Sequence, residues 1–154
     1  MFLGYYKKPE LTADVKMADG WLKTGDLGTI DDNGFVYITG RKKDIIITAG
    51  GKNVSPAPME DVINTCPIVS HGVVVGDGKP FIGALIELDQ EMVRSWLAQQ
   101  GLDSNMPMEQ IAKNDAVRAF IQQYVEKANA NVSRAESVRK FEILDEEFSQ
   151  EKAL

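Results

Sequence analysis

The stretch WLKTGDLGTIDDNGFVYITGRKKDIIITAGGKNVSPAPMED, residues 21–61, decides how this chain is organised. Its first half predicts two short strands joined by a turn at Asn33-Gly34, because both residues tolerate the positive φ values of tight hairpins. The charged cluster RKKD at 41–44 then separates this hairpin from the β-branched run IIIT at 45–48. A run of this kind fits a short buried strand.

Downstream of the loop AGGKN at 49–53, hydrophobic periodicity predicts alternating helices and strands. Ser55 before Pro56 predicts a helix start, with the serine as N-cap and the proline at the first helical position. Asp89 and Asn114 are predicted N-caps of two later helices. The predicted elements are a short helix over 9–15, a helix ending near 66, strands over 71–76, 81–88 and 137–144, helices over 90–100 and 115–131, and a loop or weak helix over 102–113.

This order of elements predicts the α+β class: a small β-hairpin element followed by a two-layer domain with a short central sheet packed by helices. We place the hairpin element at 1–43 and the domain at 44–154, with the join in the RKKD cluster. Five residues recur at helical spacing and are expected in the core: Met59, Val62, Trp96, Phe120 and Tyr124.

Composition excludes several functional classes. The chain has 154 residues, with 17 Lys plus Arg against 23 Asp plus Glu, so no global positive field attracts nucleic acid. The single cysteine, Cys66, allows no intrachain disulfide, and a reducing intracellular compartment is expected. No apolar run approaches the ~20 residues that a membrane-spanning helix needs, and the start carries no secretory signal pattern.

The sequence also lacks the common catalytic signatures. There is no CxxC or Cys₂His₂ metal pattern, no phosphate-binding P-loop and no dinucleotide-binding glycine motif. A Ser-His-Asp triad would have to use His71, which begins an apolar strand and is expected to be structural. We therefore predict no metal ligands and no complete set of catalytic residues within the chain.

Two local groups of residues suit a ligand. The first is Thr24-Gly25-Asp26, where a carboxylate lies beside a glycine at the start of a hairpin. An ionised carboxylate accepts two hydrogen bonds at once, and this suits a vicinal diol such as ribose. The alternative is a turn aspartate that bonds only its own backbone.

The second group combines GRKKD at 40–44 with the glycine loop that follows. Arg41 offers a planar set of donors for ribose or phosphate oxygens, and paired glycines free backbone N–H groups to face a ligand. The alternatives are a solvated charged face and a simple turn. The loop residues concerned are Gly50, Gly51, Lys52 and Asn53.

Taken together, these motifs resemble a known superfamily. GYYKKPELTA, followed by TGD at 24–26, GRKKD at 40–44 and GGKNVSP at 50–56, resembles the junction and C-terminal region of the adenylate-forming, AMP-binding enzymes. The stretch NANVSRAESVRKFEIL at 129–144, with FS a few residues later, is similar to bacterial long-chain fatty-acid CoA ligases.

This resemblance implies a two-step acid–thiol ligase that acts on a fatty acid with ATP, Mg²⁺ and CoA. A carboxylate attacks the α-phosphate of ATP to give acyl-adenylate and pyrophosphate, and the CoA thiol then displaces AMP. The large N-terminal domain, present in cis, carries the acyl site. The C-terminal domain rotates between two positions, one for each half-reaction.

The resemblance also implies residue roles. Asp26 matches the aspartate that holds the ribose hydroxyls of the nucleotide, and Arg41 matches an arginine that contacts the same sugar and its phosphate side. Lys43 falls at the hinge position between the two domains. The loop 50–53 matches the one that moves in for thioester formation, where glycine lets the pantetheine arm of CoA pass.

The catalytic lysine of adenylation is expected beyond Leu154, in a motif that contains neither Lys140 nor Lys152. We therefore expect residues 1–43 to be the tail of the large domain, residues 44–154 to be a truncated mobile domain, and the isolated chain to be inactive. The expected location is the cytoplasm, and a fatty-acyl substrate is compatible with peripheral membrane contact of the full-length enzyme. The alternative is a stand-alone regulatory module that binds a nucleotide or a protein partner without catalysis.

Overall fold

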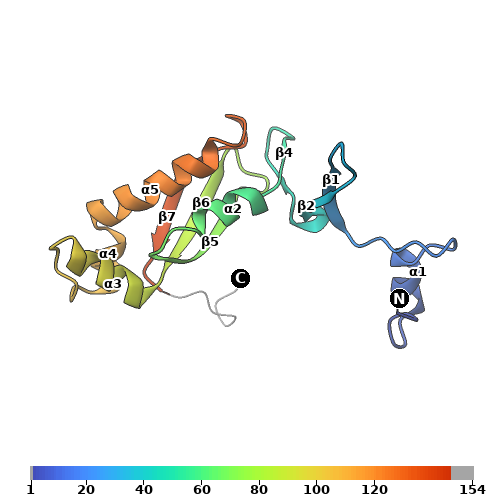
Figure 1. The fold of residues 1–154 in the computed structure, drawn as a ribbon, viewed down its shortest axis with the longest axis horizontal. Helices are drawn as coiled ribbons and strands as arrows, with labels where there is room; N and C mark the ends of the chain where they lie inside the picture. Colours follow the sequence, from blue (N-terminus) through green and yellow to red (C-terminus); the bar gives the residue numbers. More distant parts are fainter. Residues whose placement is uncertain (1, 147–154) are drawn as a thin grey trace. The chain divides into compact units, whose positions relative to one another are not determined.

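The computed structural model describes residues 2–146, and the chain forms two compact units, 1–43 and 44–154. Helices and small sheets make up both units, and the predicted α+β class is confirmed. The first unit contains a short helix and one β-hairpin (Figure 1). Its elements are α1 (Pro9–Val15), β1 (Asp26–Ile30) and β2 (Val36–Arg41), followed by the 3-10 turn η1 (Lys42–Asp44).

The turn of this hairpin is built by an aspartate rather than by the predicted Asn33-Gly34 pair alone. Only Gly34 takes a positive φ, of 86°, and Asn33 does not. The Oδ1 atom of Asp31 accepts hydrogen bonds from the backbone N–H groups of Asn33 and Phe35, each at 2.9 Å. These bonds, led by the one from Phe35, lower the pKa of the Asp31 carboxyl below its usual 3.8.

The first unit has no hydrophobic core of its own. None of residues 2–43 is buried, and apolar side chains project from both faces of the hairpin. Ile30, Ile38 and Trp21 have exposed fractions of 72%, 66% and 73%. Because monomeric proteins rarely expose so many large apolar side chains together, this surface has the composition of an interface.

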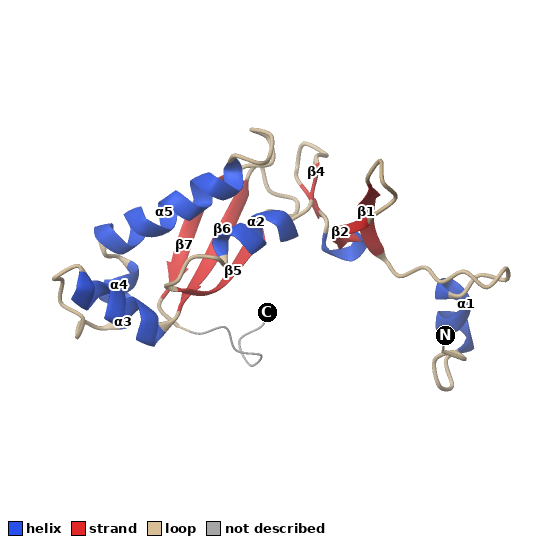
Figure 2. Cartoon of the chain, viewed as in Figure 1, coloured by secondary structure: helices blue, strands red, loops and turns tan. Residues whose placement is uncertain are grey.

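Within residues 44–146, the second unit contains the other helices and strands that the structure describes. A two-stranded hairpin precedes a three-stranded sheet with four helices (Figure 2). The elements are β3 (Ile46–Ile47), β4 (Asn53–Val54), α2 (Ala57–Ile63), β5 (Val69–Val75), β6 (Ile82–Leu88), α3 (Gln90–Gln99), α4 (Met108–Ala112), α5 (Asp115–Asn129) and β7 (Val138–Leu144).

The three-stranded sheet has the order β5-β6-β7. β5 and β6 form an antiparallel hairpin, and β7 lies parallel to β6. The helices α2 and α5 pack against each other and against the sheet, and they bury one face of each strand. The opposite face carries half-exposed side chains, including Val73 and Val75 at 38% exposure each. The second unit is therefore a two-layer structure with one open sheet face.

Buried aliphatic side chains form the core between the sheet and the helices. Met59 is fully buried as predicted, whereas Val62, Trp96, Phe120 and Tyr124 are partly buried and pack against the core. The rings of Trp96 and Phe120 stack with centroids 4.9 Å apart, and Tyr124 meets Phe120 edge to face at 5.6 Å.

Side chains of α2 and of its C-cap residue, Asn64, cover the free edge of β5. The backbone N–H of Gly72 donates to Oδ1 of Asn64 at 2.7 Å, and that of Val74 donates to Oε1 of Glu60 at 2.8 Å. Gly72 has no side chain because none fits there: an added Cβ would lie 2.6 Å from Cγ2 of Ile63. The close approach of α2 thus blocks this edge of the sheet.

Side chains of α5 cover the other edge in the same way. Asn129 binds the backbone of Val138 twice, accepting from its N–H at 2.8 Å and donating to its carbonyl at 3.0 Å. The guanidinium of Arg118 reaches the carbonyl of Phe141 at 3.5 Å. An amide side chain that pairs with a backbone in this manner takes the place of a neighbouring strand.

Two local expectations were wrong. The N-cap of α2 is Pro56, not Ser55; α2 begins at Ala57, and Pro56, whose φ and ψ angles of −71° and −36° are already helical, has no side-chain oxygen with which to cap it. The run at 45–48 gives only the two-residue strand β3, in which Ile46 is buried but Ile47 is 53% exposed. The caps at Asp89 and Asn114 are confirmed by two backbone N–H bonds each.

Candidate functional site

Asp26 and Arg41 lie opposite each other where the hairpin of the first unit begins and ends. They are register partners in the β1–β2 ladder, and Nε of Arg41 is 3.5 Å from Oδ1 of Asp26. The Arg41 side chain is 74% exposed and the Asp26 side chain 30% exposed. A carboxyl acceptor and an exposed planar donor group therefore lie side by side, an arrangement that suits hydroxyl groups of a bound sugar.

A β-bulge lies directly beside this pair. Leu27 pairs with Gly40, but Gly28 pairs with Ile38, so β2 contains Thr39 as an extra residue. Gly28 is required at this point, since an added Cβ would lie 2.9 Å from the carbonyl oxygen of Tyr37. Bulges bend a strand and re-aim the neighbouring side chains, and they are over-represented next to active sites.

The predicted glycine loop forms the tip of the β3–β4 hairpin. Thr48 and Lys52 close it through a backbone bond of 3.0 Å and through the Thr48 hydroxyl, which accepts from the Lys52 N–H at 3.2 Å. Gly51 takes a φ of 75°, whereas Gly50 does not adopt a positive φ. An added Cβ at Gly50 would meet only Oγ1 of Thr48, at 4.0 Å. Local folding thus requires glycine at 51 but not at 50.

Lys52 of this loop has an ion-pair partner far along the chain. Its Nζ lies 3.3 Å from Oε1 of Glu136, and Oε2 of Glu136 accepts from the backbone N–H of Ser133 at 2.9 Å. Hydrogen bonds from Ser133, together with Lys52, lower the pKa of the Glu136 carboxyl below its usual 4.5. No sequence pattern connects Glu136 with the loop, and residue-based reasoning did not find it.

Known proteins resemble this chain in sequence. Residues 43–152 match the family described as the AMP-binding enzyme C-terminal domain. The chain belongs to this family. This AMP-binding C-terminal domain is 46% identical over 151 residues to the long-chain-fatty-acid–CoA ligase FadD15 of Mycobacterium tuberculosis. That match covers 98% of the chain and 25% of the relative, so the chain spans about a quarter of the relative's length.

Solved structures agree with this assignment. The adenylation domain of a carboxylate reductase from Mycobacterium chelonae has a TM-score of 0.71 and 26% identity, covering 97% of this chain and 22% of that one. An O-succinylbenzoate CoA synthetase from Bacillus subtilis, solved in complex with ATP and a magnesium ion, has a TM-score of 0.61 and 25% identity, covering 94% of this chain and 25% of that one.

The AMP-binding C-terminal domain does not use His71 in a triad. Oγ of Ser70 lies 3.0 Å from Nδ1 of His71, and Oε2 of Glu87 lies 3.4 Å from the same nitrogen. A catalytic triad needs the nucleophile and the acid on different ring nitrogens, so that one accepts a proton while the other holds the ring. Because both partners lie at the same nitrogen, Ser70, His71 and Glu87 do not form a nucleophile with its base and orienting acid; the His71 side chain is exposed and Glu87 is buried.

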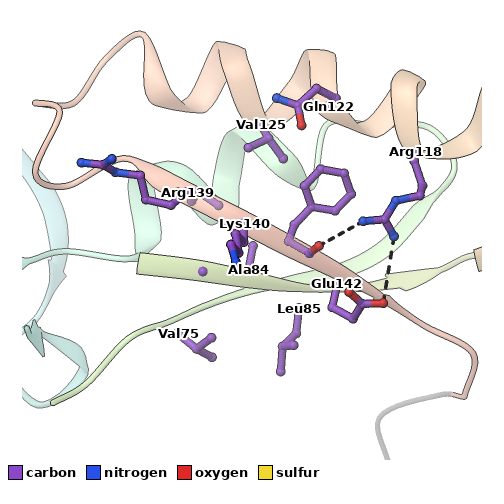
Figure 3. A pocket seen from close by; sticks show the side chains of 12 residues that line it. Val75, Ala84, Leu85, Arg118, Gln122, Val125, Arg139, Lys140 and Glu142 are labelled. Carbon is purple, nitrogen blue, oxygen red and sulfur yellow. Dashed lines mark hydrogen bonds and ion pairs between the residues drawn. The ribbon is translucent and has the colours of Figure 1, made fainter. Parts of the chain in front are cut away.

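A cavity of about 440 Å³ lies between α5 and the strands β6 and β7 of this domain (Figure 3). Three cations line it, but each has a partner within the protein. Arg118 reaches the Phe141 carbonyl and lies 4.0 Å from Oε1 of Glu142, Arg139 donates to the carbonyl of Arg134, and Lys140 lies over the ring of Phe81. None of the predicted site residues lines this cavity.

Within residues 2–146 of the AMP-binding C-terminal domain, no group of three or more His, Cys, Asp or Glu residues is arranged to hold a metal ion. None of the helices there has both the length and the apolar character needed to cross a membrane. Lys152 and Leu154, near which the adenylation lysine is expected, lie outside the described residues.

Proposed function

We propose that this chain is the C-terminal quarter of a long-chain fatty-acid–CoA ligase. The observation that carries the proposal is the 46% identity to FadD15 along 98% of the chain. In this reaction a fatty-acid carboxylate attacks the α-phosphorus of ATP, and pyrophosphate leaves. The CoA sulfur then attacks the acyl carbon, the bond to AMP breaks, and the thiol proton passes to solvent.

Asp26 and Arg41 are proposed to hold the ribose of the nucleotide. Support comes from their pairing at 3.5 Å, from the exposure of the guanidinium, and from the bulge that bends the strand beside them. The solved synthetase relative was crystallised with ATP and magnesium, which makes ATP with Mg²⁺ the nucleotide substrate we propose here. A carboxylate that accepts from both ribose hydroxyls orients the sugar, and the arginine adds donors toward its oxygen atoms.

Residues 1–43 are proposed to be the tail of a large N-terminal domain, and Lys43 the hinge. The absence of any buried residue between 2 and 43 supports the first part, because the exposed apolar side chains of this unit need a partner surface. Lys43 is the last residue of the first unit and lies in the 3-10 turn η1. Hinges are commonly a few residues at the end of an element, which absorb the change in φ and ψ.

The loop 50–53 is proposed to face CoA during thioester formation. The supporting observation is Gly50, a glycine that the fold itself does not require, since it has neither a positive φ nor a close neighbour. A ligand that must pass close to the backbone supplies a reason for the missing side chain.

The test uses the full-length ligase with palmitate and follows each half-reaction separately. Asp26→Ala is expected to slow pyrophosphate release by about 100-fold, because two hydrogen bonds to a charged acceptor are lost. Asp32→Ala removes the same charge from the same hairpin and serves as the matched control. A full-length protein that releases no pyrophosphate would support a regulatory module instead.

For the loop, Gly50→Leu should spare pyrophosphate release and slow acyl transfer from preformed acyl-adenylate to CoA. Gly50→Ala should have a smaller effect in the same direction. If Gly50→Leu reduced both half-reactions equally, the proposed role of this loop would be wrong.

A further inference from the structure

The turn between β5 and β6 is bonded to the strand that leads into the glycine loop. Oδ1 of Asp77 accepts from the backbone N–H of Ile47 at 3.0 Å, although 30 residues separate them. The N–H of Gly78 donates to the carbonyl of Ile47 at 2.8 Å, and the N–H of Ala49 donates to the carbonyl of Lys79 at 2.9 Å. The turn thus takes the place of a third strand along the free edge of β3.

This attachment matters because the β3–β4 hairpin is very small. Only two residue pairs, Ile46 with Val54 and Ile47 with Asn53, form its ladder. A two-stranded hairpin of this length is not stable alone in water. Its position relative to the three-stranded sheet is therefore set by its connections to the turn and by the burial of Ile46 and Val54.

Three hydrogen bonds join the β5–β6 turn to residues 47 and 49, and Asp77 supplies the one that involves a side chain. The other two bonds join backbone atoms and survive substitution at 77, whereas the Ile47 N–H has the Asp77 carboxylate as its acceptor. Ile47 directly precedes Thr48, the residue that closes the loop through its backbone and its hydroxyl. If the Ile47 amide shifts, Thr48 shifts with it. The hydrogen bonds between Thr48 and Lys52 then carry this displacement to Gly50 and Gly51.

We infer that Asp77 is a positioning residue for acyl transfer: its carboxylate holds the Ile47 amide and so keeps the glycine loop where CoA is to pass. This inference rests on the proposed thioester role of the loop. Asp77 need not touch CoA or the acyl-adenylate. By sequence alone Gly76-Asp77-Gly78 has only the glycines of a tight turn, and the partner of the aspartate lies 30 residues away in the chain.

The test compares Asp77→Ala with Asp77→Asn in the full-length ligase. Alanine removes the acceptor, whereas asparagine keeps an oxygen in the same place without the charge. Asp77→Ala is expected to slow acyl transfer by about tenfold, the factor expected for one hydrogen bond to a charged acceptor, and to leave pyrophosphate release unchanged. Asp77→Asn should stay within about threefold of wild type in both half-reactions. Hydrogen–deuterium exchange of a peptide containing Ile47 and Ala49 should be faster in the alanine variant alone.

Three outcomes would overturn the inference: unchanged acyl transfer in Asp77→Ala, equal losses in both half-reactions, or an Asp77→Asn variant as slow as Asp77→Ala. Gly50→Leu, measured in parallel, shows whether an unaffected Asp77→Ala variant contradicts only the positioning role of Asp77 or also the proposed thioester role of the loop. If Gly50→Leu slows acyl transfer and Asp77→Ala does not, only the positioning role is wrong. If neither variant affects acyl transfer, the thioester role of the loop is wrong as well.

Discussion

Gly50 and Gly51 are adjacent in the loop but differ in backbone conformation. Gly51 has a φ of 75°, and a Cβ in this left-handed region costs about 1–2 kcal/mol. Gly50 has no such restriction and no close neighbour. In urea unfolding of the chain, we expect Gly51→Ala to lower the free energy of unfolding by about that amount and Gly50→Ala to change it by less than about 0.5 kcal/mol. Equal losses of unfolding free energy in the two variants would contradict the conclusion that the backbone requires glycine at 51 but not at 50.

Glu136 gives the loop region a pH dependence whose sign is determined by its hydrogen bonds. Because Ser133 and Lys52 lower the pKa of the folded carboxyl below its usual 4.5, the unfolded chain binds the proton more readily. The stabilisation is present above pH 4.5 and is lost as the pH falls through the lower folded pKa.

Glu136→Gln removes this titration. We expect its free energy of unfolding to fall less steeply than that of wild type between about pH 5 and pH 3, as measured by urea unfolding across that range. Lys52→Met should reduce the pH dependence only in part, because the hydrogen bonds from Ser133 are the larger cause. A Glu136→Gln variant with the wild-type pH profile would show that this carboxylate is not involved.

At the level of elements, the contact between α2 and β5 depends on a missing side chain. A Cβ at Gly72 would lie 2.6 Å from Cγ2 of Ile63, so Gly72→Ala must push the helix away from the strand. We expect a loss of about 1–3 kcal/mol in the free energy of unfolding. Gly83→Ala, in the neighbouring strand, is the matched control, since its nearest contact would be an ordinary 3.4 Å. Thermal unfolding of both variants distinguishes local crowding from a general intolerance of alanine in this sheet.

The bidentate bond from Asn129 to Val138 allows a second test of an edge contact. Asn129→Ala leaves both backbone groups of Val138 without this partner, and a loss of about 2 kcal/mol is expected from two hydrogen bonds. Gln122→Ala, at an exposed position of the same helix where the side chain bonds, among the described residues, only Glu126 of that helix, should change the free energy of unfolding by less than about 0.5 kcal/mol. Chemical denaturation measures both, and similar values would show that Asn129 adds nothing beyond helix propensity.

Sequence reasoning succeeded where the determining contacts are local. The caps at Asp89 and Asn114 bond the next turn of their own helices, so their signal lies within a few residues. It failed where the partner is distant. The parallel pairing of β7 with β6, the Lys52–Glu136 ion pair and the bond from Ile47 to Asp77 leave no periodic trace, because periodicity shows which face is apolar and not what covers it.

Across the whole molecule, the two units differ in how they are stabilised. The second unit contains all of the buried hydrophobic residues described, whereas none of residues 2–43 is buried. We therefore expect a chain restricted to 44–154 to unfold at the same temperature as the complete chain, within about 2 °C. Hydrogen exchange should be fast throughout 2–43 and slow in β5, β6 and α5. If the β1–β2 hairpin exchanged slowly in this chain without any partner, the expectation that residues 2–43 are not stably folded by themselves would be wrong.

Helix side chains covering both outer strands of the sheet have a consequence for assembly. Unpaired strand edges are templates for aggregation and for recognition by strand addition, and here β5 and β7 offer backbone groups already bonded to α2 and α5. Growth of this sheet by a further strand, whether from a second copy or from an extended peptide, would first have to displace those side chains. A partner that contacts the open sheet face and the glycine loop leaves the edge bonds intact. The fold therefore favours contacts between preformed surfaces over the addition of a partner's strand to the sheet.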